Sequence, residues 1–317
     1  MERDGKMEKL TVIGSGTMGH SIALNAAWRG MDVKMYATNE EDIRRAEQGI
    51  GQKLRTMAEN GLFSMEESSA IRERIIITDQ LTAAVDGATF VIEAIPENLG
   101  LKQSFYARLE EMIAPDTVLA SNTSGLQPSD LAFGLRHPER FVVTHFWNPA
   151  HLIPLVEVVG GKQTSDSTRD RAMDLLHAME KKPIVVKQEI QGFIGNRLQY
   201  ALFREAQALL DAGVADKEDI DAAVTYSIGR RLPVTGPLMS ADFGGLDVFK
   251  SISDYLFRDL STLQASGETL DSLVGSGKLG VKSGEGFYDW GGTRSDEVSA
   301  ERETMLIRFL KDDEQKG

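Results

Sequence analysis

The sequence predicts an α/β domain with a doubly wound, mostly parallel sheet, followed by an all-α C-terminal domain. Three observations support this prediction. The chain has 317 residues, which exceeds the usual size of one domain. Apolar runs of strand length alternate with helical patterns over residues 1–188, whereas residues 189–317 show helical patterns only. The change of pattern near 188–192 therefore marks the expected boundary between the two domains.

The expected elements of the first domain follow one another in a regular order. Residues 9–14 read as a buried strand and residues 17–29 as a helix, and a second strand is expected at 31–37. A helical excursion follows at about 40–73, with a turn inside it. Further strand-like runs lie at 74–78, 89–95, 117–122, 140–146, 154–159 and 182–187. Strands that alternate with helices in this way form a mostly parallel sheet with helices on both faces.

The second domain begins with a long amphipathic helix. Ile194, Leu198, Leu202, Ala206 and Leu209 recur at helical spacing. More helical segments follow, and no strand run is evident. We therefore expect this domain to be entirely helical.

A glycine-rich turn joins the first strand to the first helix, in "VIGSGTMGHSIA". Gly14 permits a tight turn, Gly16 lets the backbone approach a pyrophosphate, and Gly19 lets helix and strand pack closely. The helix that begins at Thr17 and Met18 supplies free N–H groups and a positive dipole to the phosphates. The pattern predicts a Rossmann-type dinucleotide-binding domain.

The second strand lacks the acidic residue that usually binds the adenosine ribose at its end. The strand ends in Tyr36-Ala37-Thr38-Asn39, and the first acids, Glu40 and Glu41, come a few positions later. Repulsion of a 2′-phosphate is weaker without that acid, yet no Arg or Lys stands there to attract one. The residues favour NAD and leave NADP open.

Composition excludes several classes of partner and site. Lys plus Arg number 35 and Asp plus Glu 48, a formal net charge of −13, which disfavours nucleic acid and anionic membranes. The chain has no cysteine, and its N-terminus "MERDGKMEKL" has no apolar signal-peptide core. No His and carboxylate residues recur at metal-ligand spacing. We expect a cytoplasmic protein without a metal site.

Seven motifs in this order resemble the L-3-hydroxyacyl-CoA dehydrogenase family: "GSGTMGHSIA", "VIEAIPENLGLK", "LASNTSGL", "THFWNPAHLIPLVEVVGG", "GFIGNRL", "GPLMSADFGGLD" and "GVKSGEGFYDW". Carnitine dehydrogenase and gulonate 3-dehydrogenase are its small-acid relatives. The resemblance implies NAD-dependent oxidation of an L-3-hydroxyacyl-CoA such as 3-hydroxybutyryl-CoA, with fatty acid metabolism as its setting. It also implies a homodimer formed through the helical domain.

Such an oxidation needs a base for the hydroxyl proton, and His145 is the candidate. His145 ends the strand "FVVTH", and Glu157 lies inside the apolar run "PLVEVV". A carboxylate there is costly unless it is paired, and His145 is the obvious partner if the two strands are neighbours. The family's catalytic His–Glu pair falls on these positions. Of the other histidines, only His151 competes for the role.

The resemblance assigns further roles by position. Ser124 corresponds to the serine that hydrogen-bonds the substrate oxygen, and Asn196 to the family's active-site asparagine. The family's cofactor contacts fall on Glu97, Lys102, Asn148 and Lys282.

The sequence is less specific about which residues bind the non-reacting part of the substrate. Lys53 and Arg55 are the candidates for coenzyme A phosphates, but Glu59-Asn60-Gly61-Leu62 stands where thioester enzymes commonly have lysines. Arg230 and Arg231 could instead hold a free carboxylate bidentately. The sequence favours an acyl-CoA substrate, with a small free 3-hydroxy acid as the alternative. The third hypothesis is a non-catalytic NAD(H)-binding protein.

Overall fold

The computed structural model describes residues 8–316, which form two compact units. The first unit is Met1–Gly195 together with Ala300–Gly317, and the second is Asn196–Ser299. This division differs from the expected 1–188 and 189–317, because the end of the chain returns to the first unit. Ile307 and Leu310 of the last helix are buried in the core of the first unit, which explains the return.

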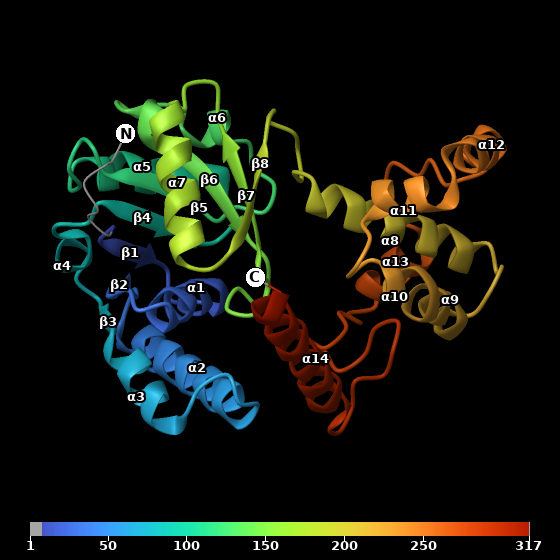
Figure 1. Cartoon of the computed structure of the whole chain (residues 1–317), viewed down its shortest axis with the longest axis horizontal. Coiled ribbons are helices and arrows are strands. Elements are labelled where there is room, and N and C mark those ends of the chain that lie inside the picture. The colour runs from blue at the N-terminus through green and yellow to red at the C-terminus, as the bar shows by residue number, and fades with distance from the viewer. Residues whose placement is uncertain (1–7, 317) are drawn as a thin grey trace. The chain divides into compact units, whose positions relative to one another are not determined.

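Eight strands of the described residues form one sheet in the first unit (Figure 1). They are β1 (Leu10–Ile13), β2 (Val33–Tyr36), β3 (Ile75–Thr78), β4 (Phe90–Glu93), β5 (Val118–Ser121), β6 (Phe141–Phe146), β7 (Leu155–Gly160) and β8 (Lys182–Val186). Their order is β3-β2-β1-β4-β5-β6-β7-β8, and only β6 and β7 pair antiparallel. The predicted doubly wound, mostly parallel sheet is confirmed. The order reverses between β1 and β4, where ligands bind in such sheets.

Helices cover both faces of this sheet. They are α1 (Thr17–Trp28), α2 (Glu40–Glu59), α3 (Met65–Glu73), α4 (Leu81–Val85), α5 (Leu99–Glu110), α6 (Pro128–Leu131) and α7 (Asp166–Ala178), with a 3₁₀ turn at Pro138–Arg140. Successive strand residues point to opposite faces. Val12 and Ile92 accordingly join one apolar cluster, while their neighbours Ile13 and Val91 join the other.

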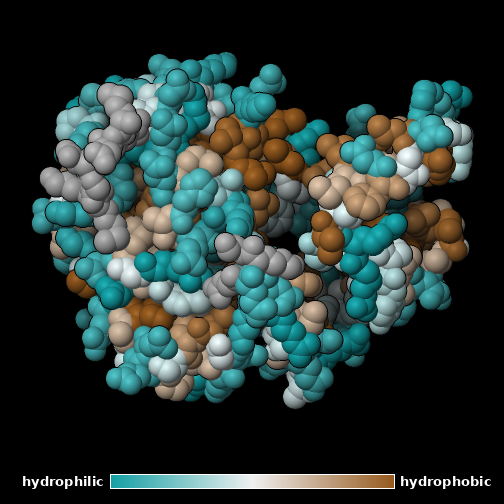
Figure 2. Space-filling model, viewed as in Figure 1, coloured by the Kyte–Doolittle hydropathy of each residue, from teal (hydrophilic) through white to brown (hydrophobic). Residues whose placement is uncertain are grey.

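The second unit is helical, as predicted. It contains α8 (Gly195–Asp211), α9 (Lys217–Ala223), a π-helical turn (Val224–Ile228), α10 (Gly229–Arg231), α11 (Pro237–Gly244), α12 (Leu246–Leu256) and α13 (Glu268–Gly275). The last helix, α14 (Arg294–Lys316), starts in this unit and ends in the first. Figure 2 shows many hydrophobic side chains on the surface of the helical unit.

The described residues contain no helix that is both long and apolar enough to cross a bilayer. The same residues contain no cluster of three side chains suited to binding a metal ion.

Candidate active site

The glycine turn at the carboxyl end of β1 fits a bound dinucleotide. A Cβ on Gly14 would lie 2.6 Å from the Ala94 carbonyl oxygen, and a Cβ on Gly19 only 1.8 Å from that of Gly14. A Cβ on Gly16 would meet no atom within 4 Å. Gly16 caps α1 without any side-chain hydrogen bond, so the first N–H groups of the helix are left for a ligand. Glycine is therefore sterically required at two positions, and the third leaves open space for phosphate.

His20 of α1 connects this turn to α2. Its Nε2 lies 3.0 Å from Lys53 Nζ and its Nδ1 3.2 Å from the Ser15 carbonyl oxygen. Because an ammonium only donates, Nε2 accepts and Nδ1 carries the proton that is donated to Ser15. Burial and the Lys53 charge lower the pKa of His20, which keeps the ring neutral. Gly49 makes room for this ring, since a Cβ there would lie 2.8 Å from Nε2.

A carboxylate that sequence reasoning missed lies close to the end of β2. Asp42 in the first turn of α2 accepts hydrogen bonds from the Thr38 hydroxyl at 2.8 Å and the Asn39 amide at 3.1 Å. The Thr38 hydrogen bond and the nearby Arg45 lower the pKa of Asp42. The strand-end position Ala37 is itself buried. The acid is thus displaced along the chain, beside the residues that follow β2.

A second buried carboxylate, Glu93, ends β4. It accepts hydrogen bonds from Lys102 Nζ at 2.7 Å, from Ser121 Oγ at 2.8 Å and from the Tyr106 hydroxyl. Burial and the Glu93 charge raise the pKa of Tyr106 well above its usual value, so the phenol stays a donor. Sequence reasoning missed Glu93, although it carries the same signal as Glu157, an acid inside an apolar strand.

The same cluster positions the predicted serine. Glu97 accepts a hydrogen bond from the Ser124 N–H at 3.0 Å through Oε1, while its Oε2 lies 3.5 Å from Lys102 Nζ. Asn122 accepts a hydrogen bond from the Phe146 N–H at 2.8 Å, which ties this segment to the end of β6. The structure therefore brings Glu97, Lys102 and Ser124 together at the carboxyl edge of the sheet.

His145 and Glu157 are directly paired across the antiparallel strands β6 and β7. His145 Nδ1 donates to Glu157 Oε2 at 2.8 Å, and both side chains are buried. The other carboxylate oxygen accepts from the N–H groups of Ile194 at 2.9 Å and Gly195 at 3.0 Å. Burial alone would raise the pKa of Glu157, but these hydrogen bonds outweigh it and hold the pKa low. Glu157 thus fixes the tautomer of His145 and leaves Nε2 as its proton acceptor.

His151, the competing histidine, has a different environment. Its Nδ1 lies 2.8 Å from Ser21 Oγ on α1. Burial, together with the Lys53 and Lys181 charges, lowers its pKa to about 3. Lys181 also donates to the carbonyl oxygens of Ala150 and Ile153, in the loop that carries His151. Asn148, a predicted cofactor contact, is exposed in that same loop.

The remaining predicted residues are distributed over both units. Arg55 is exposed on α2 of the first unit. Four lie in the second unit: Asn196 in the first turn of α8, Arg230 and Arg231 exposed on α10, and Lys282 exposed in the loop before α14.

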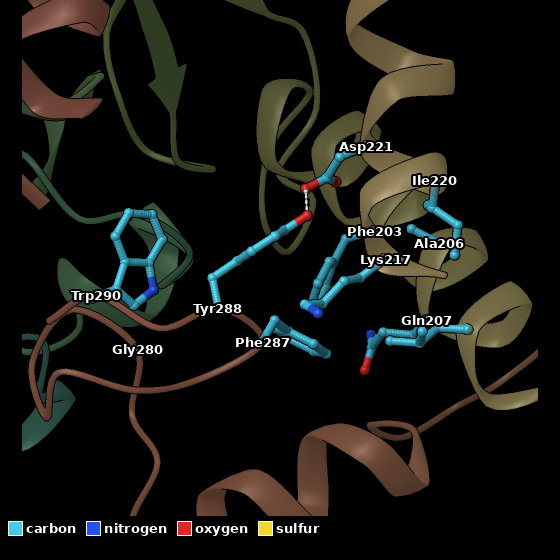
Figure 3. A pocket seen from close by; sticks show the side chains of 11 residues that line it. Phe203, Ala206, Gln207, Lys217, Ile220, Asp221, Gly280, Phe287, Tyr288 and Trp290 are labelled. Atoms are coloured by element: carbon cyan, nitrogen blue, oxygen red, sulfur yellow. Dashed lines mark hydrogen bonds between the residues drawn. The ribbon is translucent and has the colours of Figure 1, made fainter. Parts of the chain in front are cut away.

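The second unit also has a pocket of about 300 Å³ between α8, α9 and the 280–290 loop. Figure 3 shows Phe203, Phe287 and Tyr288 lining it, with the Tyr288 hydroxyl donating to Asp221 at 2.7 Å. None of the predicted catalytic or binding residues lines this pocket.

Comparison with known proteins gives two matches to one family. Residues 9–190 match the NAD binding domain of 3-hydroxyacyl-CoA dehydrogenase, and residues 192–290 match its C-terminal domain. The 5-formyl-3-hydroxy-2-methylpyridine 4-carboxylate 5-dehydrogenase of Mesorhizobium japonicum is 36% identical, covering 95% of this chain and 96% of its own. A probable 3-hydroxybutyryl-CoA dehydrogenase of Bacillus subtilis is also 36% identical, covering 90% and 98%.

A solved structure of a 5-dehydrogenase with the same pyridine carboxylate in its name, described as an NAD+ dependent dismutase, is similar in fold. It superimposes with a TM-score of 0.90 at 34% identity, covering 96% of this chain and 99% of its own.

Proposed function

This chain belongs to the 3-hydroxyacyl-CoA dehydrogenase family and binds NAD; on that premise we propose that it oxidises a 3-hydroxyacyl-CoA to the 3-oxoacyl-CoA. The observation that carries the proposal is the buried His145–Glu157 pair, with Nδ1 to Oε2 at 2.8 Å. Glu157 holds the imidazole with Nε2 as a base, and the glycine turn of the same unit fits the cofactor.

The reaction divides between cofactor and protein. NAD held at the glycine turn of Gly14, Gly16 and Gly19 would supply the acceptor for the hydride that leaves C3 of the substrate. His145 Nε2 takes the hydroxyl proton as the C3–H bond breaks, and Glu157 stabilises the imidazolium that forms. In the proposal, Ser124 and Asn196 hold the substrate oxygen as the alcohol becomes a carbonyl. Glu97 supports this by binding the Ser124 N–H at 3.0 Å, which fixes the backbone of the loop.

Within the cofactor site we assign Lys102 and Glu97 to the nicotinamide end. Lys102 is only 1% exposed, and Glu93 compensates its charge, whereas Glu97 is 44% exposed. Glu93 thus satisfies the ammonium and leaves Glu97 able to accept hydrogen bonds from hydroxyl groups. Asn148 and Lys282 remain the further proposed contacts.

The part of the substrate that the protein binds away from C3 has two candidates, coenzyme A and a free carboxylate. Lys53 and Arg55 on α2 would bind coenzyme A phosphates, and Lys53 already donates to His20 beside the glycine turn. A small free 3-hydroxy acid is the second candidate, with Arg230 or Arg231 as the carboxylate ligand. The name of the Mesorhizobium japonicum relative, which specifies a pyridine carboxylate, favours this second candidate.

The experiment compares NADH oxidation by the purified protein with acetoacetyl-CoA and with free acetoacetate at neutral pH. Turnover with the thioester supports a coenzyme A substrate. In that case Lys53→Met should raise the KM for acetoacetyl-CoA about tenfold. Turnover restricted to acetoacetate supports the free acid, with Arg230→Met and Arg231→Met as the variants to compare. Failure of both compounds, with NADH still bound, would contradict a 3-oxo substrate.

We also propose that the protein acts as a homodimer formed through the helical unit. Every residue of Asn196–Ser299 is described, and none of its hydrophobic side chains is among the buried ones. Leu238 and Phe243 on α11 are each 83% exposed. A helical unit without its own buried core needs a second surface, and an apolar surface this extensive is typical of an obligate interface.

A further inference from the structure

Trp147 lies beside the catalytic histidine. It follows β6, two residues after His145, so the two side chains leave the extended chain on the same side. Their ring centres are 5.4 Å apart, with the ring planes inclined by 55°. Phe193 lies against the other side of the imidazole, its ring centre 5.6 Å away.

Gly195 makes room for this indole. A Cβ at position 195 would lie 2.3 Å from Cζ2 of Trp147 and 3.1 Å from Cε2, distances that no side chain could occupy without displacing the ring. The Gly195 N–H donates to Glu157 at 3.0 Å, so this backbone cannot move away without disturbing the catalytic carboxylate. Gly195 thus both contacts the indole and holds Glu157, so the position of the indole depends on the same backbone that orients the His145–Glu157 pair.

The indole nitrogen of Trp147 is buried and has no acceptor in the part of the chain that the structure describes. A buried donor without a partner is unfavourable for the folded protein. Asn25 and Thr144 also have a buried polar atom for which the described residues provide no partner. Trp147 is the one whose ring contacts the catalytic imidazole. In an active site, a bound substrate can provide the acceptor that such a donor lacks.

We propose that the Trp147 indole N–H donates a hydrogen bond to the C1 oxygen of the substrate while His145 acts on the C3 hydroxyl. This inference rests on the proposed function. C1 and C3 are separated by a single carbon, and the two rings that would bind their oxygens are adjacent. The shared chemistry is an acyl or carboxylate oxygen on the carbon β to the reacting carbon. The indole thereby selects 3-hydroxy acids or their thioesters over simple secondary alcohols.

The test is Trp147→Phe, which keeps an aromatic ring and removes the N–H. The bond exists in the bound substrate and in the transition state alike, so its loss raises KM and leaves kcat largely unchanged. We expect KM for the accepted 3-oxo substrate to rise about tenfold, and more for a free carboxylate, because bonds to charged acceptors are stronger. Trp28→Phe is the matched control, since Trp28 packs on Phe63.

A second measurement uses inhibitors that lack the C3 oxygen. Butyryl-CoA and butanoate keep the C1 oxygen, so the inhibition constant of the one that matches the substrate class should rise by the same factor in Trp147→Phe. The inhibitor whose constant changes also identifies the source of the acceptor, thioester or free acid. The affinity for NADH should be unchanged.

The outcomes separate the two proposals. If the wild-type protein reduces no 3-oxo compound, the proposed function is wrong. If it is active and Trp147→Phe has wild-type KM and inhibition constants, the indole assignment is overturned. A fall in kcat at unchanged KM also overturns it, because that result indicates that Trp147 only packs against His145.

Gly195→Ala provides a coupled test of the same geometry. In the wild-type background it should displace the indole and raise KM. In the Trp147→Phe background it should add little further increase in KM, since the N–H is already gone. Equal, additive effects on KM in both backgrounds would contradict the proposed link between Gly195 and the indole.

Discussion

At the scale of single residues, the site depends on carboxylates buried in apolar strands. Glu93 and Glu157 are both fully buried, and each accepts several hydrogen bonds. A buried charge is tolerated only with such partners, and removing one partner leaves the remainder uncompensated. The two glutamates therefore act by holding Lys102 and His145 in place.

Glu157→Gln tests this role directly. An amide can still accept from His145, but it cannot stabilise the imidazolium that forms when the proton is taken. We expect kcat to fall by about 10²-fold or more, with little change in NADH affinity. Steady-state kinetics and NADH titration measure both quantities. A variant with wild-type kcat would show that Glu157 is only structural.

Sequence reasoning reached His145 and Glu157 because both signals are local: a strand-end histidine and an acid inside an apolar run. It did not reach Asp42, Glu93 or the Trp147–Gly195 contact. Asp42 stands in for the missing strand-end acid, although it lies four positions after Thr38. Only the folded turn shows that the side chains of Thr38 and Asp42 meet. Gly195 and Trp147 are far apart in the chain, so no spacing rule connects them.

At the scale of elements, the sequence was most informative about the sheet. The strands of the first unit, its first helix and the helical region at about 40–73 were predicted close to their observed bounds, because hydrophobic periodicity and glycine turns are local signals. The return of α14 to the first unit was not predicted. That packing depends on Ile307 and Leu310 meeting a core built near the start of the chain, which periodicity does not reveal.

The loop between β6 and β7 depends on a buried lysine. Burial, with a smaller contribution from Arg29, lowers the pKa of Lys181 from 10.5 to about 7. The unfolded chain therefore binds more protons than the folded one between pH 7 and 10.5. Stability should rise with pH through this window, by at most about 1.4 kcal/mol per pH unit.

Lys181→Met should abolish that rise. Urea unfolding at pH 6, 8 and 10 gives the free energy of unfolding of each protein. The advantage of the wild type over the variant should grow between pH 7 and 10, while Lys182→Met, at the exposed neighbour, should show no such trend. A difference that is constant with pH would contradict the coupling.

At the scale of the whole molecule, the exposed apolar helices of the second unit predict dimerisation. Sedimentation equilibrium should give twice the mass of one chain. Phe243→Glu should shift the protein to monomer and weaken the helical unit. Phe133→Glu, which changes a residue that is 78% exposed in the first unit, is the control and should remain dimeric. A monomeric wild type would contradict the proposal.

We propose above all that His145 transfers the proton at the C3 oxygen: it takes the proton when the alcohol is oxidised and gives it when the 3-oxo compound is reduced. The most direct test of this proposal is the rate of NADH oxidation by wild type and His145→Ala with the accepted 3-oxo substrate, alongside an NADH titration of both. We expect kcat to fall by about 10²–10⁴-fold in His145→Ala, with NADH affinity unchanged. Turnover at the wild-type rate in His145→Ala would contradict it.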